Sequence, residues 1–563
     1  MPSLTSNSND AATSNSSTEE PWNNWPNDIG FDPEYEERTP VELTVLGDIP
    51  AYAAGTLYRI GPGKSQVETK DGQLFQLSHW FDGFSQTHRF QILSSEASTR
   101  VLYNSRFGTD ALIEHVRATG NIGKFGFGQK RDPCKSVFNK VQTEYVPPVV
   151  PDPPIVPDSM NISVTLSVNM PGLDHDPNRS NERWANGIRT LYAKTDYSAF
   201  QKLDPETLEP IGLATQESLH PDLTGPQTAS HARSDPVTGD MYNFNLTLGA
   251  ESTYRVFGVS ASNGKTTILA TFTGIPAYVH SLFITEDYVL LCVWNSHLNP
   301  LELAKGSFMD SIMPTDPSKP AKWYVVDRKN GKGLVATYDS PAFFCFHTIN
   351  AWQEPSKEDP TKTDIVADLV RLDNTEFLKF LYYENLKSSL PSAKKFAASR
   401  GEVLRSTITR FRLPTLPYVP SPETLQATVE WSSCRPFSPE LPTMNPAFVT
   451  KKYRYAYATT FSGKATLTDG IMKFDCETQE TSLWGHHGHS PGEPIFVANP
   501  KGESEDDGVL LSVVLDGLRG YSYLLCLDAR DLTELGRAEV KGVVGFGFHG
   551  QHVPVVGIPT GDW

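Results

Sequence analysis

The sequence predicts an all-β protein built from many short antiparallel strands. Apolar runs of about five residues, rich in Val, Ile, Tyr and Thr, recur from about Val41 onward. Turn sequences such as DPVTGD, SNGK, RKNGKG and DDG separate these runs. The 41 Gly, 43 Pro and 11% aromatic residues favour tight turns and strands over long helices. Such a pattern is typical of a propeller or of several sandwiches, and the residues alone leave both architectures and the blade number open.

The expected elements follow a polar beginning. Residues 1–28 are mostly Ser, Asn, Thr and acidic residues, so we assign 1–35 to a disordered tail and 36–563 to a single folded domain. The expected strands are, in order, GTLYRIGPG, QTHRFQIL, TRVLYNSRF, YRVFGVS, TTILATFTG, YVLLCVW, KWYVVDR, GLVATYDS, DIVADLVRL, TITRFRL, YAYATTF, GIMKFD, GVLLSVVL, YSYLLCLDA and AEVKG.

Three segments depart from the strand pattern. Residues 375–388 place Phe377, Phe380, Leu381 and Leu386 at helix-like spacing, which predicts a helix. The Pro-rich stretch 146–158 is expected to be an extended insertion rather than a sheet strand. Residues 108–145 mix apolar and basic side chains, which is typical of a surface loop with short helices or of a membrane-facing entrance.

Charge and cysteine content narrow the class of protein. The net charge of −17 disfavours nucleic acid as a partner. The six cysteines are far apart and form no CxxC pair, which is compatible with a reducing cytosol. Because the first 25 residues lack an apolar core and no run of 18 apolar residues occurs, the sequence predicts neither a secretory signal nor a membrane span. We therefore expect a cytoplasmic protein, peripheral at most to membranes or lipid bodies.

Four histidines beside strand-like runs are candidate metal ligands. Each of His231, His280, His347 and His549 is bracketed by apolar and small turn residues, which suggests a buried, neutral imidazole. Taken singly, each is more typical of an ordinary half-buried histidine. Four neutral imidazoles that converge from separate blades on a propeller axis would suit a borderline metal such as Fe(II). Periodicity alone does not show such convergence.

A set of ordered motifs gives a resemblance to a known family. The motifs are YRIGPG (58–63), HWFDGFSQTHRF (79–90), HARSDPVTGD (231–240), VHSLFITEDYVLL (279–291), FHTINAW (346–352), EPIFVANP (493–500), EDDGVLLSVVLD (505–516) and GFHG (547–550). Together and in this order the chain resembles the carotenoid cleavage oxygenases, from about residue 40 to 556. The form of HWFDG, the segment YEERTPVELTVLGDIPAYAAGTLYR and the polar tail most resemble the fungal torulene dioxygenases.

The resemblance implies a fold and a metal site. It implies a seven-bladed β-propeller, spanning 36–563 as one oxygenase domain, with loops and short helices forming a cap over the iron site. By motif position, His231, His280, His347 and His549 would bind Fe(II). In the family, acidic side chains bond the other ring nitrogen of three of these histidines, and the matching positions here are Asp196, Glu440 and Glu493. Asp196 stands where the family usually has Glu, so the shorter side chain requires a closer backbone or a bridging water.

Other histidines receive different interpretations. His79 and His88 lie in the N-terminal motif, which the family does not use for iron, so we interpret them as structural. The run HHGH (486–489) has the residue types of a chelating loop, but is more typical of a solvated turn.

The resemblance implies an Fe(II) dioxygenase that cleaves a conjugated C=C bond of a carotenoid or apocarotenoid, torulene-like, with O2 to give aldehydes. Its partners would be an apolar polyene and O2, with possible peripheral membrane contact through about 108–145. No organic cofactor is implied, since no GxGxxG follows a strand. The alternatives are a stilbene (resveratrol-type) dioxygenase, which predicts polar groups at the far end of the tunnel, a retinoid isomerohydrolase, and a binding module without iron.

Overall fold

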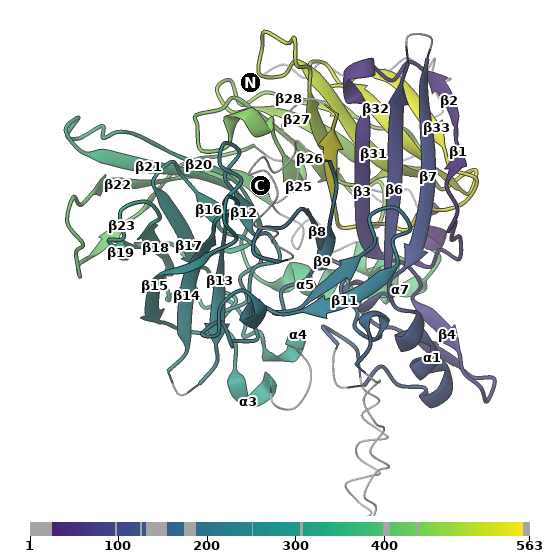
Figure 1. The fold of residues 1–563 in the computed structure, drawn as a ribbon, viewed down its shortest axis with the longest axis horizontal. Coiled ribbons are helices and arrows are strands. Elements are labelled where there is room, and N and C mark those ends of the chain that lie inside the picture. Colours follow the sequence, from purple (N-terminus) through teal and green to yellow (C-terminus); the bar gives the residue numbers. More distant parts are fainter. Residues whose placement is uncertain are drawn as a thin grey trace, which may run out of the picture.

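The structure, a computed structural model, describes residues 25–95, 98–123, 126–130, 155–173, 187–249, 251–303, 308–397, 406–434 and 437–555. Within these residues, seven antiparallel sheets of four to six strands and one two-stranded hairpin form a seven-bladed propeller (Figure 1). Two described pairings are parallel: one at an outer edge, between β19 (Leu334–Ser340) and β23 (Thr424–Gln426), and the isolated bridge between His231 and Ser281. The all-β, seven-bladed prediction is therefore confirmed.

The first three blades take their strands mainly from the N-terminal half of the chain. In hydrogen-bonded order, the first contains β1 (Val41–Glu42), β7 (Thr99–Phe107), β6 (Ser85–Ser94), β3 (Gly55–Pro62) and β34 (His549–Pro554). The second contains β11 (Pro210–Ala214), β10 (Phe200–Leu203), β9 (Leu191–Lys194) and β8 (Thr165–Val168). The third contains β12 (Arg233–Ser234), β13 (Met241–Thr247), β14 (Thr253–Val259) and β15 (Thr266–Thr273).

The fourth blade contains β16 (Phe283–Ile284), β17 (Tyr288–Val293), β18 (Ala321–Asp327), β19 and β23. The fifth contains β20 (Phe344–Pro355), β21 (Thr363–Leu372), β22 (Thr407–Leu416) and β24 (Thr428–Ser432). The sixth contains β25 (Ser438–Thr443), β26 (Tyr455–Phe461), β27 (Gly470–Asp475) and β28 (Thr481–Trp484). The seventh contains β29 (His489–Pro491), β30 (Ile495–Ala498), β31 (Gly508–Asp516), β32 (Tyr521–Asp528), β33 (Glu534–Glu539) and β2 (Thr44–Gly47). The separate hairpin is β4 (Gln66–Glu68) with β5 (Leu74–Gln76).

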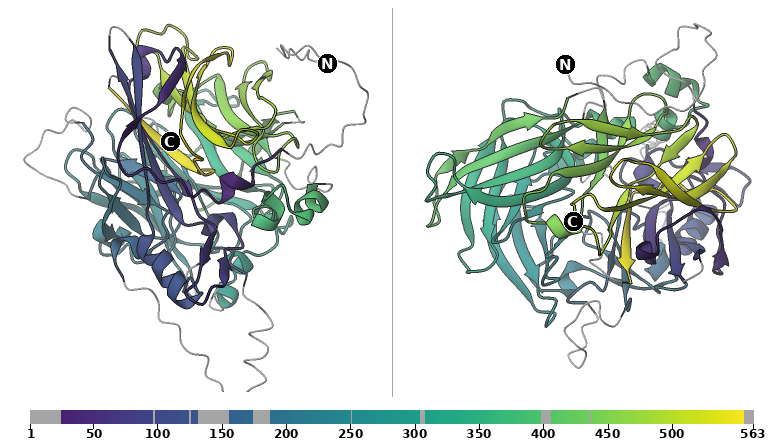
Figure 2. Two further views of the ribbon diagram at one scale, coloured as in Figure 1. Left: turned by 90° about the vertical axis from the view of Figure 1, so that its right-hand side faces the viewer. Right: turned by 90° about the horizontal axis from the view of Figure 1, so that it is seen from above.

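The two ends of the chain close the ring of blades. The C-terminal strand β34 pairs with β3 of the first blade, and Figure 2 shows it beside the N-terminal strands. Conversely, the N-terminal strand β2 joins the last blade, where it pairs with β33. Two interlocks of this kind tie the first blade to the last, which protects the ring against opening.

The inner strands of neighbouring blades contact one another around the axis. Contacts join β8 to β34, β34 to β30, β16 to β20, and β20 to β25. The strands that build the blades are largely apolar and buried; β31, for example, is buried along its whole length. This packing fixes the positions of the side chains at the ends of the inner strands.

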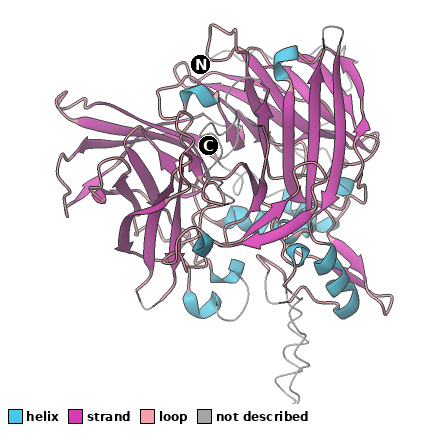
Figure 3. Cartoon of the chain, in the orientation of Figure 1, coloured by secondary structure: helices cyan, strands magenta, loops and turns pink. Residues whose placement is uncertain are grey.

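Short helices gather on one side of the propeller (Figure 3). They are α1 (Asp110–Thr119), α3 (Pro300–Leu303), α4 (Phe308–Ser311), α5 (Glu376–Phe380), α6 (Tyr383–Leu386) and α7 (Pro391–Ala397). The 3-10 turns are η1 (Asp28–Phe31), η2 (Ala51–Ala53), η3 (Trp80–Asp82), η4 (Pro157–Ser159), η5 (Gln216–Ser218) and η6 (Pro446–Phe448). No helix in the described part of the chain has the length and apolar character needed to cross a membrane.

The single helix expected at 375–388 is wrong, because it is interrupted between α5 and α6. Tyr382 is extended there and bridges His79, while the carbonyl of Leu381 accepts a bond from the Trp80 N–H. The apolar periodicity does mark the inward face, since Phe377, Phe380 and Leu386 are all buried. A backbone pairing with a distant segment overrides local helix propensity at this point.

The expected tail of residues 1–35 is too long at its C-terminal end. Phe31 is 1% exposed and packs against the rings of Trp80, Tyr383 and Phe546. The Asp32 carboxylate accepts the backbone N–H of Ser65. Residues 25–35 are thus part of the folded structure; residues 1–24 lie outside the described residues.

The segment 108–145 is described in part. Helix α1 packs Leu112, Ile113 and Val116 into the main hydrophobic core, so its apolar face is already covered. Residues 131–145, and 146–154 of the Pro-rich stretch, lie outside the described residues.

Candidate metal centre

Four histidines from four blades converge on the propeller axis. His347 lies on β20 and His549 is the first residue of β34. His231 lies two residues before the short inner strand β12, and His280 lies three residues before β16. The pairing of β20 with β21 shifts register between Cys345 and Thr348. Such a bulge re-aims a side chain, and here it sits at His347. His231 and His280 are tied together, because the His231 N–H bonds the His280 carbonyl at 3.2 Å.

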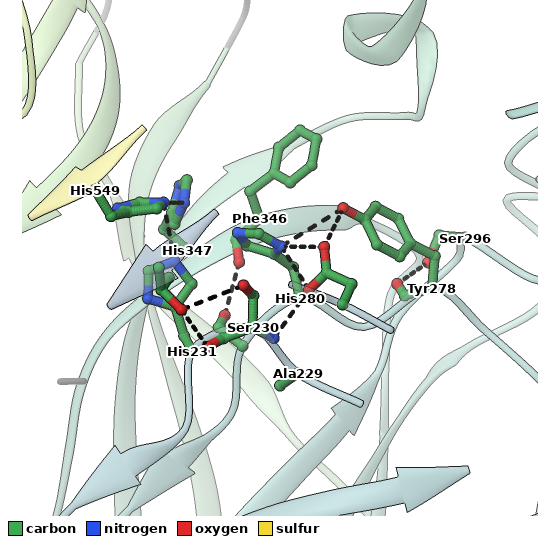
Figure 4. A network of polar contacts seen from close by, with 12 residues as sticks. Ala229, Ser230, His231, Tyr278, His280, Ser296, Phe346, His347 and His549 are labelled. Carbon is green, nitrogen blue, oxygen red and sulfur yellow. Dashed lines mark hydrogen bonds and ion pairs between the residues drawn. The ribbon is translucent and has the colours of Figure 1, made fainter. Parts of the chain in front are cut away.

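The ring nitrogens are spaced as metal ligands. One nitrogen from each of the four histidines lies within 4.8 Å of the others (Figure 4). The Nε2 of His549 is 3.0 Å from that of His231 and 3.2 Å from that of His347. With metal–nitrogen bonds of ~2.1 Å, these two separations subtend angles of ~90–100° at a shared ion. All four side chains are at most 9% exposed.

Three of the four imidazoles bond a carboxylate through Nδ1. His347 Nδ1 is 2.5 Å from Glu440 Oε2, and His549 Nδ1 is 2.7 Å from Glu493 Oε1. His280 Nδ1 lies 2.9 and 2.8 Å from the two oxygens of Asp196. When Nδ1–H donates to a carboxylate, Nε2 carries the lone pair and points at the centre.

The shorter Asp196 reaches its histidine directly. The sequence left a closer backbone or a bridging water open, and the 2.8 Å contact shows that no bridge is needed. The Asp196 segment sits close because its carbonyl accepts the Thr228 N–H and its Oδ1 accepts the Ser230 N–H at 2.9 Å.

Burial favours the uncharged form of two of the four imidazoles, those of His231 and His549. Desolvation, followed by the neighbouring imidazoles, lowers the pKa of both His231 and His549 well below the usual range. Neutral imidazole is the form that ligates a metal. Converging lone pairs on nitrogens about 3 Å apart repel one another unless a cation lies between them, so the donor set fits a divalent metal ion.

An apolar cavity of about 660 Å³ adjoins one side of the cluster. His280, His347 and His549 reach it, and the rest of its wall is mainly aromatic and aliphatic. The motif HWFDG supplies Trp80 and Phe81 to this wall. A much smaller chamber of about 50 Å³ is lined by His231, and also by His347 and His549.

The remaining histidines are not part of the cluster. His79 caps η3 by accepting the Phe81 N–H, and its Nε2 bonds the Leu378 carbonyl at 2.9 Å. Burial lowers the pKa of His79 to about 4. His88 bonds the Tyr103 hydroxyl at 3.0 Å. In HHGH, His486 and His487 are exposed and His489 bonds the Tyr523 hydroxyl at 2.9 Å.

Sequence reasoning missed two supporting residues. Arg59 Nη1 bonds Glu493 Oε2 at 2.6 Å, and the Tyr278 hydroxyl donates to Asp196 Oδ2 at 2.8 Å. Both had a signal. An arginine inside the apolar strand GTLYRIGPG needs a buried acid, and Tyr278 stands two residues before His280, a spacing that puts side chains on the same face of extended chain.

Gly61 of YRIGPG explains why that motif is glycine-rich. A Cβ on Gly61 would lie 2.4 Å from the Cα of Gly547, so only glycine lets β3 approach the segment that leads into His549.

Comparisons with known proteins agree with this fold. Residues 30–554 match the family described as retinal pigment epithelial membrane protein. The chain is 40% identical to a carotenoid dioxygenase of Neurospora crassa, over 95% of this chain and 92% of the relative. It is 42% identical to a torulene dioxygenase of Gibberella fujikuroi, over 95% of both chains. Among solved structures, a variant of the Synechocystis apocarotenoid oxygenase superposes with a TM-score of 0.70 at 23% identity, covering 95% of this chain and 99% of the other.

Proposed function

Since the chain belongs to the retinal pigment epithelial membrane protein family, we propose that it is a carotenoid cleavage dioxygenase that holds Fe(II) with His231, His280, His347 and His549. It cleaves a conjugated C=C bond of a carotenoid with O2 and releases aldehydes. The observation that carries the proposal is the opening of an aromatic cavity directly onto the four-histidine cluster. Torulene is the proposed substrate, and the propeller acts as a single catalytic domain.

Iron is proposed from the chemistry of the donors. Imidazole nitrogens suit Fe(II), and His231, His280, His347 and His549 would hold it. The bound ion would supply the activation of O2. The carboxylates of Asp196, Glu440 and Glu493 orient three imidazoles and offset the charge of the dication.

The side chains around the ion have three tasks. The aromatic wall binds the polyene by contact and excludes water, because apolar rings offer few hydrogen bonds. The cavity shape sets which double bond lies beside the cluster. No proton needs to move from a side chain when both oxygen atoms of O2 enter the products.

The similarity to carotenoid enzymes favours a carotenoid over a stilbene substrate. Among the described residues that line the cavity, none is Lys or Arg, whereas the acids Asp82, Asp196 and Glu440 do line it. The rest of the wall is mainly aromatic and aliphatic, which suits an apolar polyene. The relatives from Neurospora crassa and Gibberella fujikuroi are likewise carotenoid enzymes.

Membrane contact is proposed at the cavity mouth rather than along α1. The apolar face of α1 is buried, but Ile155 lines the cavity and is 89% exposed, and Leu301 on α3 is 75% exposed. Exposed aliphatic side chains beside an apolar opening suit the surface of a membrane or lipid body. Co-flotation with vesicles should weaken in the variant I155E/L301E.

Product analysis tests the function. Purified protein loaded with Fe(II) is incubated separately with torulene, β-carotene, β-apo-8′-carotenal and resveratrol, and aldehydes are identified by chromatography and mass. An apocarotenal from torulene supports the proposal and locates the cleaved bond. Hydroxybenzaldehydes from resveratrol alone would overturn it.

A further inference from the structure

We propose that Tyr278 is a positioning residue that fixes the Asp196 carboxylate, and through it the ring of the metal ligand His280. The inference rests on the proposed iron site and adds a residue to it. Tyr278 is 1% exposed, and its hydroxyl donates to Asp196 Oδ2 at 2.8 Å. His280 Nδ1 lies 2.8 Å from the same carboxylate oxygen, and Figure 4 shows the Tyr278 hydroxyl beside the His280 ring.

The length of Asp196 makes this support necessary. The other two imidazole partners, Glu440 and Glu493, are glutamates, and only the His280 partner is an aspartate. A short carboxylate that lies almost equally far from His280 Nδ1 through both oxygens, at 2.8 and 2.9 Å, has no directional preference of its own. Donors on either side set its plane.

Those donors are placed one on each oxygen. The Ser230 N–H binds Oδ1 at 2.9 Å, and the Tyr278 hydroxyl binds Oδ2. The backbone of Tyr278 is itself anchored, because its carbonyl accepts the Trp294 indole N–H at 3.0 Å and the Ser296 hydroxyl at 2.5 Å.

The same residue is part of the cavity wall. Tyr278 lines the cavity, and its ring lies 5.7 Å from Phe127 and 5.3 Å from Phe308. One side chain thus contacts the space for the substrate and also holds a bond that leads to the ion. We infer that substrate seating against this ring is transmitted to His280.

The first experiment removes only the hydroxyl. Tyr278→Phe, with Fe(II) affinity measured against a competing chelator, should bind iron roughly tenfold more weakly, as expected for loss of a partner in the second coordination sphere. The electron paramagnetic resonance spectrum of the nitric oxide adduct of the Fe(II) protein should broaden, because His280 samples several orientations. In the wild type, adding the polyene should shift this spectrum, and the shift should shrink in the variant.

The second experiment tests the length argument. In the wild-type background, Asp196→Glu adds a methylene where the Tyr278 hydroxyl already sits, and iron affinity should fall. In the Tyr278→Phe background the same change gains room, so Y278F/D196E should bind iron more tightly than either single variant. A purely structural role for Tyr278 predicts additive losses instead.

The control is a buried tyrosine far from the ion. The Tyr457 hydroxyl bonds the Ala529 carbonyl at 2.9 Å, and Tyr457→Phe should leave iron affinity and the spectrum unchanged. Wild-type affinity and an unchanged spectrum in Tyr278→Phe, or additive losses in the double variant, would overturn the inference. Failure of the wild type itself to bind Fe(II) would instead overturn the proposed iron site.

Discussion

Two limbs support the cluster in different ways. We call Arg59, Glu493 and His549 the Arg59 limb, and Tyr278, Asp196 and His280 the Tyr278 limb. In the Arg59 limb a buried cation, 3% exposed, pairs with a carboxylate that also accepts the Gly550 N–H. In the Tyr278 limb a neutral hydroxyl and one backbone N–H hold a carboxylate whose side chain is 15% exposed.

The difference suggests that one limb serves mainly the stability of the fold and the other mainly the binding of iron and substrate. Burial raises the pKa of Glu493 to about 7 and lowers that of Arg59, so each charge depends on the other. That limb connects the ion to strands β3 and β34, which close the propeller. The Tyr278 limb borders the cavity and carries no cation. We expect changes in the first to affect folding, and changes in the second to affect chiefly iron and substrate.

The largest loss of iron and activity should follow the removal of His549 or His280, the histidine at the end of each limb. His549→Ala removes a ligand, so bound iron should be lost and turnover should fall on the order of 10³-fold or more. His280→Ala should also lose bound iron and turnover, because His280 is the proposed ligand at the end of the Tyr278 limb. Metal content and product formation are the measurements. His487→Ala, an exposed residue of HHGH, is the matched control, and normal iron content in His549→Ala would contradict the ligand set.

Arg59→Met should separate the limbs by stability. It leaves a carboxylate buried without its cation, which costs about 3–5 kcal/mol, measured by urea unfolding of the metal-free protein. Tyr278→Phe loses one hydrogen bond to a carboxylate and should cost less, about 1.5–3 kcal/mol, in the same assay. The double variant R59M/E493Q should recover part of the loss, because it removes both charges. Equal losses in Arg59→Met and Tyr278→Phe would remove the distinction between the limbs.

Replacing the carboxylates of Asp196 and Glu493 by carboxamides should show the difference between the two limbs more clearly. Asp196→Asn keeps an acceptor for one donor and should weaken iron binding about 10–100-fold with little effect on the metal-free fold. Glu493→Gln should weaken iron binding similarly and also destabilise the metal-free protein, since Arg59 is left buried without its anion. Chelator competition and thermal melting of both variants are compared. If metal-free Glu493→Gln melts at the wild-type temperature, the two limbs do not differ in their contribution to stability.

Much of this arrangement is accessible from sequence, because strands have a local signal. TRVLYNSRF and YAYATTF coincide with β7 and β26, since alternating or continuous apolar runs report strand burial directly. The four histidines are selected by their motifs, and the structure brings them together. Their convergence depends on contacts between blades far apart in the chain, which periodicity does not encode.

Tertiary contacts determine what sequence reasoning misses. The break in the helix at Tyr382 comes from pairing with His79, about 300 residues away in the chain. The packing of Phe31 against Trp80 and Phe546 turns part of a polar segment into core. Arg59 and Tyr278 escape prediction because they are not metal-ligand residue types; they act on the acids that hold the ligands.

A further expected effect concerns acid and involves a histidine beside Arg59. His88 stands directly opposite Arg59 in the pairing of β3 with β6. Burial, followed by the Arg59 charge, lowers the pKa of His88 to about 3. The unfolded imidazole takes up its proton near pH 6.5, so the unfolded state binds more protons than the folded state between these values. The stability that His88 contributes is therefore complete above pH 6.5 and is lost as pH falls toward 3.

Between pH 7 and pH 5 this loss should be about 2 kcal/mol. His88→Gln cannot titrate, so its stability should fall by that much less over the same interval, whatever its stability at pH 7. Urea unfolding of the metal-free proteins at both pH values gives the two slopes. Other buried histidines titrate equally in both proteins and cancel in the difference. Equal slopes would show that a proton on His88 is tolerated opposite Arg59.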